Sequence, residues 1–360
     1  MSSSNQLVCT KGLLRFLEDP RYPSVGPHLR LLEFTGLWHP NNTKLTKFKQ
    51  CFFYITIAFF FSQYVKCCIS MEVDSLMLIL KYAPFHMGIV KSCFFRKSYK
   101  KWETLIDFIS SREQKQLAKN DEEYDGILNE YINRSRRVSY FFWGLAFFSN
   151  FSIFSEPYQN NQIIENGTSI YYYIFDGYTP FSNEPPGYYV SMAIQTILGL
   201  IVSAYVVGWD TLVVTMMIFF AGQLRISRLN CVKIIDRSSK IKSHENIGTC
   251  HSLYTDLIKY QKIFNSLISP AMFIYLIVIS VNLGVCIIQI AQSKLVSYGI
   301  FESDWVCSDK RLQKEVALLG VTTTKILVFK AGLFNVMSLS TFIAILRASY
   351  SFYTLLSETN

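Results

Sequence analysis

The sequence carries none of the short motifs that mark the commonest catalytic centres. It has no Gly-rich phosphate loop, no nucleophile elbow and no paired catalytic carboxylates. Its nine cysteines are scattered without a C-x-x-C pair. The histidines His39, His86, His244 and His251 lack metal-ligand spacing. We therefore predict that the chain is not an enzyme, that it uses no cofactor and no metal, and that its cysteines are reduced thiols.

Two further absences concern targeting and partners. The first 46 residues lack the apolar core and cleavage site of a signal peptide, so we expect the first spanning helix to act as the signal anchor. The net charge of +9 does not indicate nucleic-acid binding, because the basic residues lie in loops between apolar stretches. Half of the residues are hydrophobic, which favours one membrane-embedded helical bundle over a soluble domain.

The apolar stretches predict six transmembrane helices in a single domain that covers residues 1–360. A cytosolic N-terminal segment, 1–47, contains a short amphipathic stretch, His28–Trp38, that suits the membrane surface but is too short to cross it. The first five spans lie within 48–291, and Pro84 is expected to kink the second. The predicted spans are residues 48–69, 75–95, 138–157, 188–221, 263–291 and, in the closing stretch, 326–356.

Loop charges predict the orientation. The outer loop, 158–187, has no Lys or Arg, has three acids, and contains a glycosylation sequon at Asn166. The segments before span one and after spans two and four are basic, which places the N-terminus in the cytosol. Residues 292–325 then pose a conflict: five spans leave them outside, yet they carry the basic residues of a cytosolic loop. The sequons at Asn41, Asn133 and Asn150 are expected to be unused.

The closing stretch, Leu333–Asn360, is apolar except along one helix face. That polar seam lies at alternating steps of four and three and consists of Ser340, Ala344, Arg347, Ser351, Thr354 and Glu358. Small polar residues commonly pack helix against helix in membranes. The two charges on the same seam favour a water-filled path instead.

The same stretch resembles the C-terminal signature of the insect odorant receptors. The resemblance rests on Lys330–Phe334 (KAGLF), Ser338–Phe342 (SLSTF) and Leu346–Leu356 (LRASYSFYTLL), with support from Ser303–Trp305 (SDW) and Gly208–Thr211 (GWDT). It implies an all-α bundle of seven spans with a cytosolic N-terminus. This chain shows six, because the fifth span runs almost directly into the loop where the family has its sixth.

The resemblance also implies a function and its residues. Family members are tuning subunits that assemble with a common co-receptor into a hetero-tetrameric, non-selective cation channel in the plasma membrane of olfactory neuron dendrites. We expect the pore to be lined by Ser351, Thr354, Leu355 and Glu358, with Leu355 as a hydrophobic gate. A pocket for a small volatile hydrophobic ligand is expected at Tyr82, Phe147, Phe151, Met192 and Gln195, although each aromatic is also an ordinary core residue.

Three alternatives stay open. The missing span is compatible with a truncated non-conducting isoform or with an incomplete gene model. A gustatory receptor should end in T-Y-x-x-x-x-x-Q-F, and a G-protein-coupled receptor should carry D-R-Y and N-P-x-x-Y; none of these is present. A transporter is disfavoured because no inverted repeat is visible.

Overall fold

The computed structural model describes two compact units, Met1–Met272 and Phe273–Asn360. The described residues are 16–40, 43–71, 75, 78–79, 81–119, 121–160, 164–165, 168–169, 171–175, 177–178, 180–182, 184–235, 239–302, 310–323, 330–331, 335–336, 343–344, 347 and 351. They are mainly helical, as the sequence predicts.

Among the described residues, the first unit contains six complete helices and the first part of a further one. They are α1 (Gly26–Phe34), α2 (Lys44–Ser70), α4 (Ala83–Lys97), α5 (Tyr99–Leu117), α6 (Glu122–Asn160), α7 (Gly187–Val232) and α8 (Lys240–Glu302). A short hairpin, β1 (Ile164–Glu165) and β2 (Thr168–Ser169), pairs antiparallel with Ile164 opposite Ser169. Three helices among the described residues are long and apolar enough to cross a membrane: Lys44–Ser70, Glu122–Gln159 and Gly187–Val232.

Local signals set the ends of the first two predicted spans. The Thr43 hydroxyl accepts the amide hydrogen of Thr46 and caps the start of α2. Met71 ends α2 in the left-handed conformation, with φ 53°. In the second span the helix breaks at Tyr82, and Pro84 lies in the first turn of α4, where its missing N–H costs no hydrogen bond. The break at Pro84 is thus the predicted kink.

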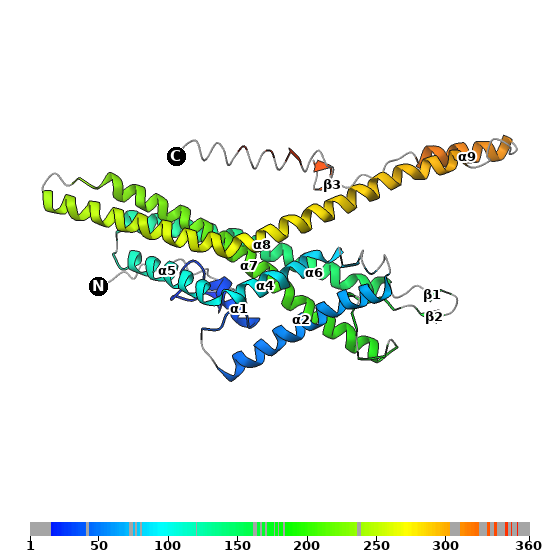
Figure 1. Cartoon of the computed structure of the whole chain (residues 1–360), viewed down its shortest axis with the longest axis horizontal. Helices are drawn as coiled ribbons and strands as arrows, with labels where there is room; N and C mark the ends of the chain where they lie inside the picture. The colour runs from blue at the N-terminus through cyan, green and yellow to red at the C-terminus, as the bar shows by residue number, and fades with distance from the viewer. Residues whose placement is uncertain are drawn as a thin grey trace. The chain divides into compact units, whose positions relative to one another are not determined.

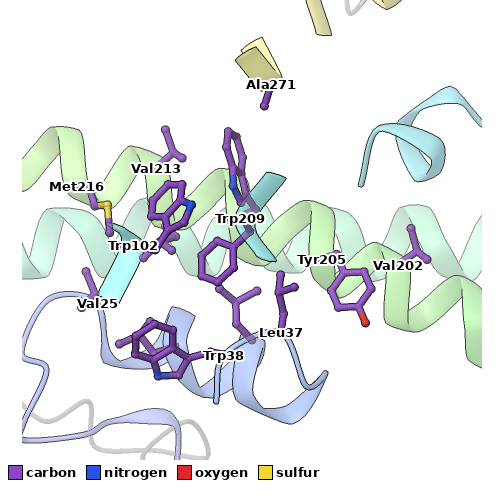
Figure 2. Packing of buried hydrophobic residues seen from close by; sticks show 14 of the residues in the cluster. Val25, Leu37, Trp38, Trp102, Val202, Tyr205, Trp209, Val213, Met216 and Ala271 are labelled. Atoms are coloured by element: carbon purple, nitrogen blue, oxygen red, sulfur yellow. The ribbon is translucent and has the colours of Figure 1, made fainter. Parts of the chain in front are cut away.

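Helix α7 is the central element of the first unit, and α1, α4 and α6 pack along it (Figure 1). Its 46 residues correspond to about 69 Å, so it extends well beyond a hydrocarbon core of about 30 Å. Figure 2 shows its aromatic centre, where the Trp209 ring lies edge-on to Trp102 with centroids 6.4 Å apart. Tyr205, one turn earlier, is buried in the same cluster.

The N-terminal stretch lies differently from the expectation. From its sequence, His28–Trp38 was expected to lie at the membrane surface, but α1 is part of the protein core. Leu29 and Leu32 are buried, and a Cβ at Gly208 of α7 would lie 3.0 Å from the Leu32 Cδ2 atom. A short apolar helix face is satisfied equally by lipid and by protein, and here α7 provides the partner.

A polar clamp, defined as Glu18, Glu113 and Arg136 with the backbone of residues 23–24, fixes this N-terminal segment. The Arg136 guanidinium donates to both carboxylate oxygens of Glu18, at 2.8 and 2.6 Å, and to the carbonyl oxygens of Pro23 and Ser24, each at 2.6 Å. Glu113 of α5 accepts from the Ser24 amide at 3.0 Å and from the Tyr131 hydroxyl at 2.9 Å. The clamp therefore joins the N-terminal segment to α5 and α6.

His28 extends the polar contacts from α1 to α6 and α7. Its Nε2 atom lies 2.8 Å from the Ser139 Oγ and 3.2 Å from the Thr215 Oγ1. The Thr215 hydroxyl also lies 2.6 Å from that of Ser135. These groups are buried, so their mutual hydrogen bonds replace those that water would provide.

Helices α4 and α7 approach closely at Gly88, which yields a stability prediction. A Cβ at Gly88 would lie 2.5 Å from the Val206 Cγ2 and 3.2 Å from the Val202 carbonyl oxygen. Gly88→Ala is therefore expected to destabilise the protein by about 1–3 kcal/mol, as overpacking does. Gly126→Ala on α6, where nothing lies within 4 Å, is the control and should stabilise by up to about 1 kcal/mol. Thermal unfolding in nanodiscs measures both, and equal shifts would contradict the close approach.

The second unit holds the end of α8, then α9 (Lys310–Thr323), β3 (Lys330–Ala331) and β4 (Asn335–Val336). In the segment 292–325, predicted as a polar loop, the described residues 292–302 and 310–323 are helical. Charge alone does not distinguish an exposed helix from a loop, because Lys, Gln and Glu are good helix formers.

The closing stretch also starts differently from the predicted helix 326–356. β3 and β4 pair antiparallel, with Ala331 opposite Asn335, where that helix was expected to begin. Gly332 between the two strands disfavours an uninterrupted helix. Helical conformation is described further on, at Ile343, Ala344, Arg347 and Ser351.

Candidate ligand pocket

A cluster of aromatic rings closes around Phe175, a buried residue of the outer loop. The Phe175 ring lies 5.0 Å from Phe60 of α2, 5.2 Å from Tyr82 and 5.6 Å from Phe85 of α4, measured between centroids. The Phe59 ring is also close, at 6.2 Å. We call this set the aromatic box. Its walls come from separate segments, so only the folded bundle assembles it.

Gln195 of α7 holds the loop in the aromatic box. Its side-chain oxygen accepts from the Phe175 amide at 3.0 Å, and its side-chain nitrogen donates to the Phe175 carbonyl at 3.1 Å. A glycine one turn on, Gly199, leaves room for this approach. A Cβ there would lie 2.8 Å from the Phe154 ring and 3.2 Å from the Phe175 ring. The Phe175 backbone is therefore fixed by paired hydrogen bonds, as in a strand pair.

Three buried polar atoms near these elements have no hydrogen-bond partner in the described structure. They are the Nε2 of His86 on α4, the Nε2 of Gln63 on α2 and the Oγ of Ser191 on α7. The His86 ring lies 5.2 Å from Phe60 and 5.0 Å from Tyr64, so it borders the aromatic box. An apolar aromatic site with a few unfilled polar groups suits a small hydrophobic molecule that carries a hydroxyl or carbonyl.

The structure brings together three of the five residues predicted for this pocket. Tyr82 forms part of the aromatic box, Gln195 binds the Phe175 backbone, and Met192 is fully buried one turn before Gln195. Phe147 and Phe151 lie apart from them. Their side chains are 68% and 71% exposed, on an outward face of α6. Their rings therefore do not line this pocket.

Of the aromatic box, the sequence predicted only Tyr82; Phe59, Phe60, Phe85 and Phe175 escaped the prediction, and so did His86 at its border. Phe175 ends the apolar run Tyr171–Phe175 in an otherwise polar loop, and that run was the available signal. Nothing distinguishes His86 in the sequence from any other histidine beside an apolar stretch. Phe147 and Phe151 were chosen instead because α6 is aromatic on nearly every face, so its sequence does not reveal which face is buried.

The charged residues of the spans form ion pairs. Lys81 contacts Glu156 at 2.7 Å, and both side chains are about half exposed. Asp210 lies 2.6 Å from the buried Lys91 ammonium group, which is 5.1 Å from the Trp209 ring centre. Asp210 also borders an open groove of about 340 Å³ between α6 and α7, next to Phe142 and Leu145. The groove is separate from the aromatic box.

The predicted pore and glycan residues lie largely outside the described residues. Thr354, Leu355, Glu358 and Asn166 are among these, although the hairpin β1–β2 flanks Asn166 on both sides. Ser351 is described as helical and exposed. The pore prediction therefore stays a prediction.

Long apolar helices of this kind are typical of membrane proteins. Comparison with known families makes the class specific: the family model described as "7tm Odorant receptor" matches residues 82–293, more than half of the chain. The chain belongs to the odorant receptor family, as its closing signature indicates.

One solved structure supports the fold. The structure of the insect olfactory receptor OR5 from Machilis hrabei is similar with a TM-score of 0.51 and 14% sequence identity, over 93% of this chain and 98% of that one. The same receptor in complex with eugenol gives a TM-score of 0.48 at 14% identity, over the same shares of the two chains. Comparison with curated proteins found no match.

Proposed function

We propose that this chain is the tuning subunit of an odorant-gated, non-selective cation channel. In this proposal it assembles with the common co-receptor into a hetero-tetramer in the plasma membrane of olfactory neuron dendrites. The observation that carries the proposal is the aromatic box, with its unfilled polar atoms, in a chain of the odorant receptor family. The polar seam on the closing stretch supports a pore, through Ser351, Thr354, Leu355 and Glu358.

The ligand is proposed to bind in the aromatic box by replacing contacts that Phe175 makes. Small odorants are mostly apolar with one polar group, and His86 or Ser191 offers that group a hydrogen bond. Tyr82 and Phe85 offer ring faces and edges to the apolar part. Displacement of the loop from Gln195 would link binding to a movement of the bundle.

Oocyte expression with the co-receptor tests this function. Odorant-evoked cation currents are the expected result across a panel of volatile ligands. Tyr82→Ala and Phe175→Ala are expected to change the half-maximal concentration by about tenfold, because each removes a buried aromatic contact. Phe147→Ala removes the same kind of ring from the exposed face of α6 and should change it by less than about threefold. Equal effects of Phe147→Ala and Phe175→Ala would place the ligand elsewhere.

A second candidate is a truncated, non-conducting isoform. The observation that favours it is the basic segment 292–325, which follows the fifth span without a further apolar run. An epitope tag after Asn360, detected with and without permeabilisation, reveals the side of the membrane that the C-terminus occupies. An extracellular tag supports seven crossings and a pore, whereas a cytosolic tag supports six and the non-conducting isoform.

A further inference from the structure

A polar cleft separates α5 from the first part of α8, away from the aromatic box. The two helices contact where Phe108 and Tyr260 stack with ring centroids 3.7 Å apart and planes 8° from parallel. One turn along, the Arg112 Nη2 atom lies 4.0 Å from the Asp256 Oδ2 atom. Beyond that point lies a cleft of about 710 Å³, with Ile226 and Asn230 of α7 among its lining residues. It is large enough for a ligand of drug size.

The α5 wall of the cleft is basic. Arg112, Lys115 and Lys119 are spaced by three and four residues, so they lie on one face of the helix, and all three line the cleft. Glu245 is the only acid among its described lining residues. Lys115 and Lys119 are exposed and form no ion pair within the described part of the chain. The cleft therefore carries an unbalanced positive charge.

Arg112 lines the cleft with unused hydrogen-bonding capacity. Its Nε and Nη2 atoms are buried and have no hydrogen-bond partner among the described residues. These two atoms form one edge of the guanidinium group, the edge that can donate in parallel to two oxygens of one phosphate. Burial lowers the pKa of the Arg112 guanidinium, and Asp256 opposes this only in part. An oxyanion in the cleft would supply the missing partner after a small side-chain rotation.

We infer that this cleft binds a phosphate-bearing polyol that bridges α5 and α8. A phosphate beside Arg112 would accept from its guanidinium group, and further phosphates would contact Lys115 and Lys119. The hydroxyl groups of Thr249 and Ser252 on the α8 wall can bond to the ligand's own hydroxyl groups. The ligand is either a free sugar or inositol phosphate or the headgroup of a phosphoinositide in the membrane. Both share the same chemistry, and the experiment below distinguishes them.

Two binding arms use the full-length chain in phosphatidylcholine nanodiscs. The first titrates inositol trisphosphate and measures the dissociation constant by calorimetry. The second compares thermal unfolding in nanodiscs with and without phosphatidylinositol bisphosphate. Saturable binding that weakens with added salt is expected in at least one arm. Binding in the first arm identifies a soluble ligand, whereas stabilisation only in the second identifies a membrane lipid.

Charge variants localise the site. Lys115→Gln/Lys119→Gln is expected to raise the dissociation constant at least about tenfold, because charge-assisted hydrogen bonds are lost. Lys101→Gln removes an exposed lysine of the same helix outside the cleft and should leave binding within about twofold. Glu245→Gln removes the opposing acid and should tighten binding. Arg112→Gln should weaken binding most. If Arg112→Gln does not fold, the variants of the exposed lysines still test the site.

Two results would overturn the inference. One is the absence of saturable binding in both arms. The other is an equal loss in Lys101→Gln and in the double lysine variant, which would indicate nonspecific attraction to a basic surface. No odorant is present in either arm, so the outcome does not depend on the proposed channel function.

Discussion

Arg136→Met is expected to lower the free energy of unfolding by about 3–5 kcal/mol, since it breaks a buried ion pair and leaves one charge behind. The change removes both contacts to the Glu18 carboxylate and those to the carbonyl oxygens of Pro23 and Ser24. A loss of this size is a large share of the stability of an ordinary domain. Thermal unfolding of the purified chain in nanodiscs measures it, and surface delivery in cells should fall in parallel.

Two further variants separate the clamp from a general charge effect. Arg134→Met removes an exposed arginine two residues earlier on α6 and should change stability by less than about 0.5 kcal/mol. Glu18→Leu/Arg136→Met leaves no unpaired charge and should recover part of the loss. If Arg134→Met and Arg136→Met were equally harmful, the polar clamp would have no special role in stability.

The second large effect concerns pH, because Glu113 and His28 titrate in opposite senses. Burial raises the pKa of the Glu113 carboxyl from 4.5 to about 7, against the lowering effect of its bonds to Ser24 and Tyr131. Burial, helped by the nearby Arg136 charge, lowers the pKa of His28 from 6.5 to about 3. Between about pH 4.5 and 6.5 the folded state therefore holds a proton on Glu113 that the unfolded state lacks. On His28 the unfolded state holds a proton that the folded state lacks.

The two groups consequently oppose each other in the pH dependence of stability. Acidification through this window stabilises the fold through Glu113 and destabilises it through His28, each by about 1.4 kcal/mol per pH unit. In His28→Gln only Glu113 of the two groups still titrates, so the free energy of unfolding should rise as the pH falls. In Glu113→Gln only His28 of the two groups still titrates, so the free energy of unfolding should fall as the pH falls.

Unfolding midpoints across the window test these slopes. All other titrating groups are shared, so the difference between the two variants reports on Glu113 and His28. The double variant Glu113→Gln/His28→Gln should return to the wild-type slope. Parallel pH profiles for the two single variants would show that neither group is titrated as its burial implies.

The sequence alone was sufficient for the class of protein and for the positions of three long apolar helices. Long apolar runs, a break at Pro84 and the signature from Lys330 to Leu356 are local features, and each can be seen without knowledge of the neighbours. The membrane acts on each run separately, through its length and its apolar character. For this reason α2, α6 and α7 contain the first, third and fourth predicted spans, and family membership agrees with the signature.

Only the tertiary structure decided which side of each helix is buried. In water an exposed face is polar, so periodicity reveals the core; next to lipid the exposed face of α6 is as aromatic as its buried face. Phe147 and Phe151 therefore could not be distinguished from pocket residues, and Phe175 could not be placed within the bundle. The pairs Lys91–Asp210 and Arg136–Glu18 join residues more than a hundred positions apart. No local pattern encodes such contacts, because folding alone brings these residues together.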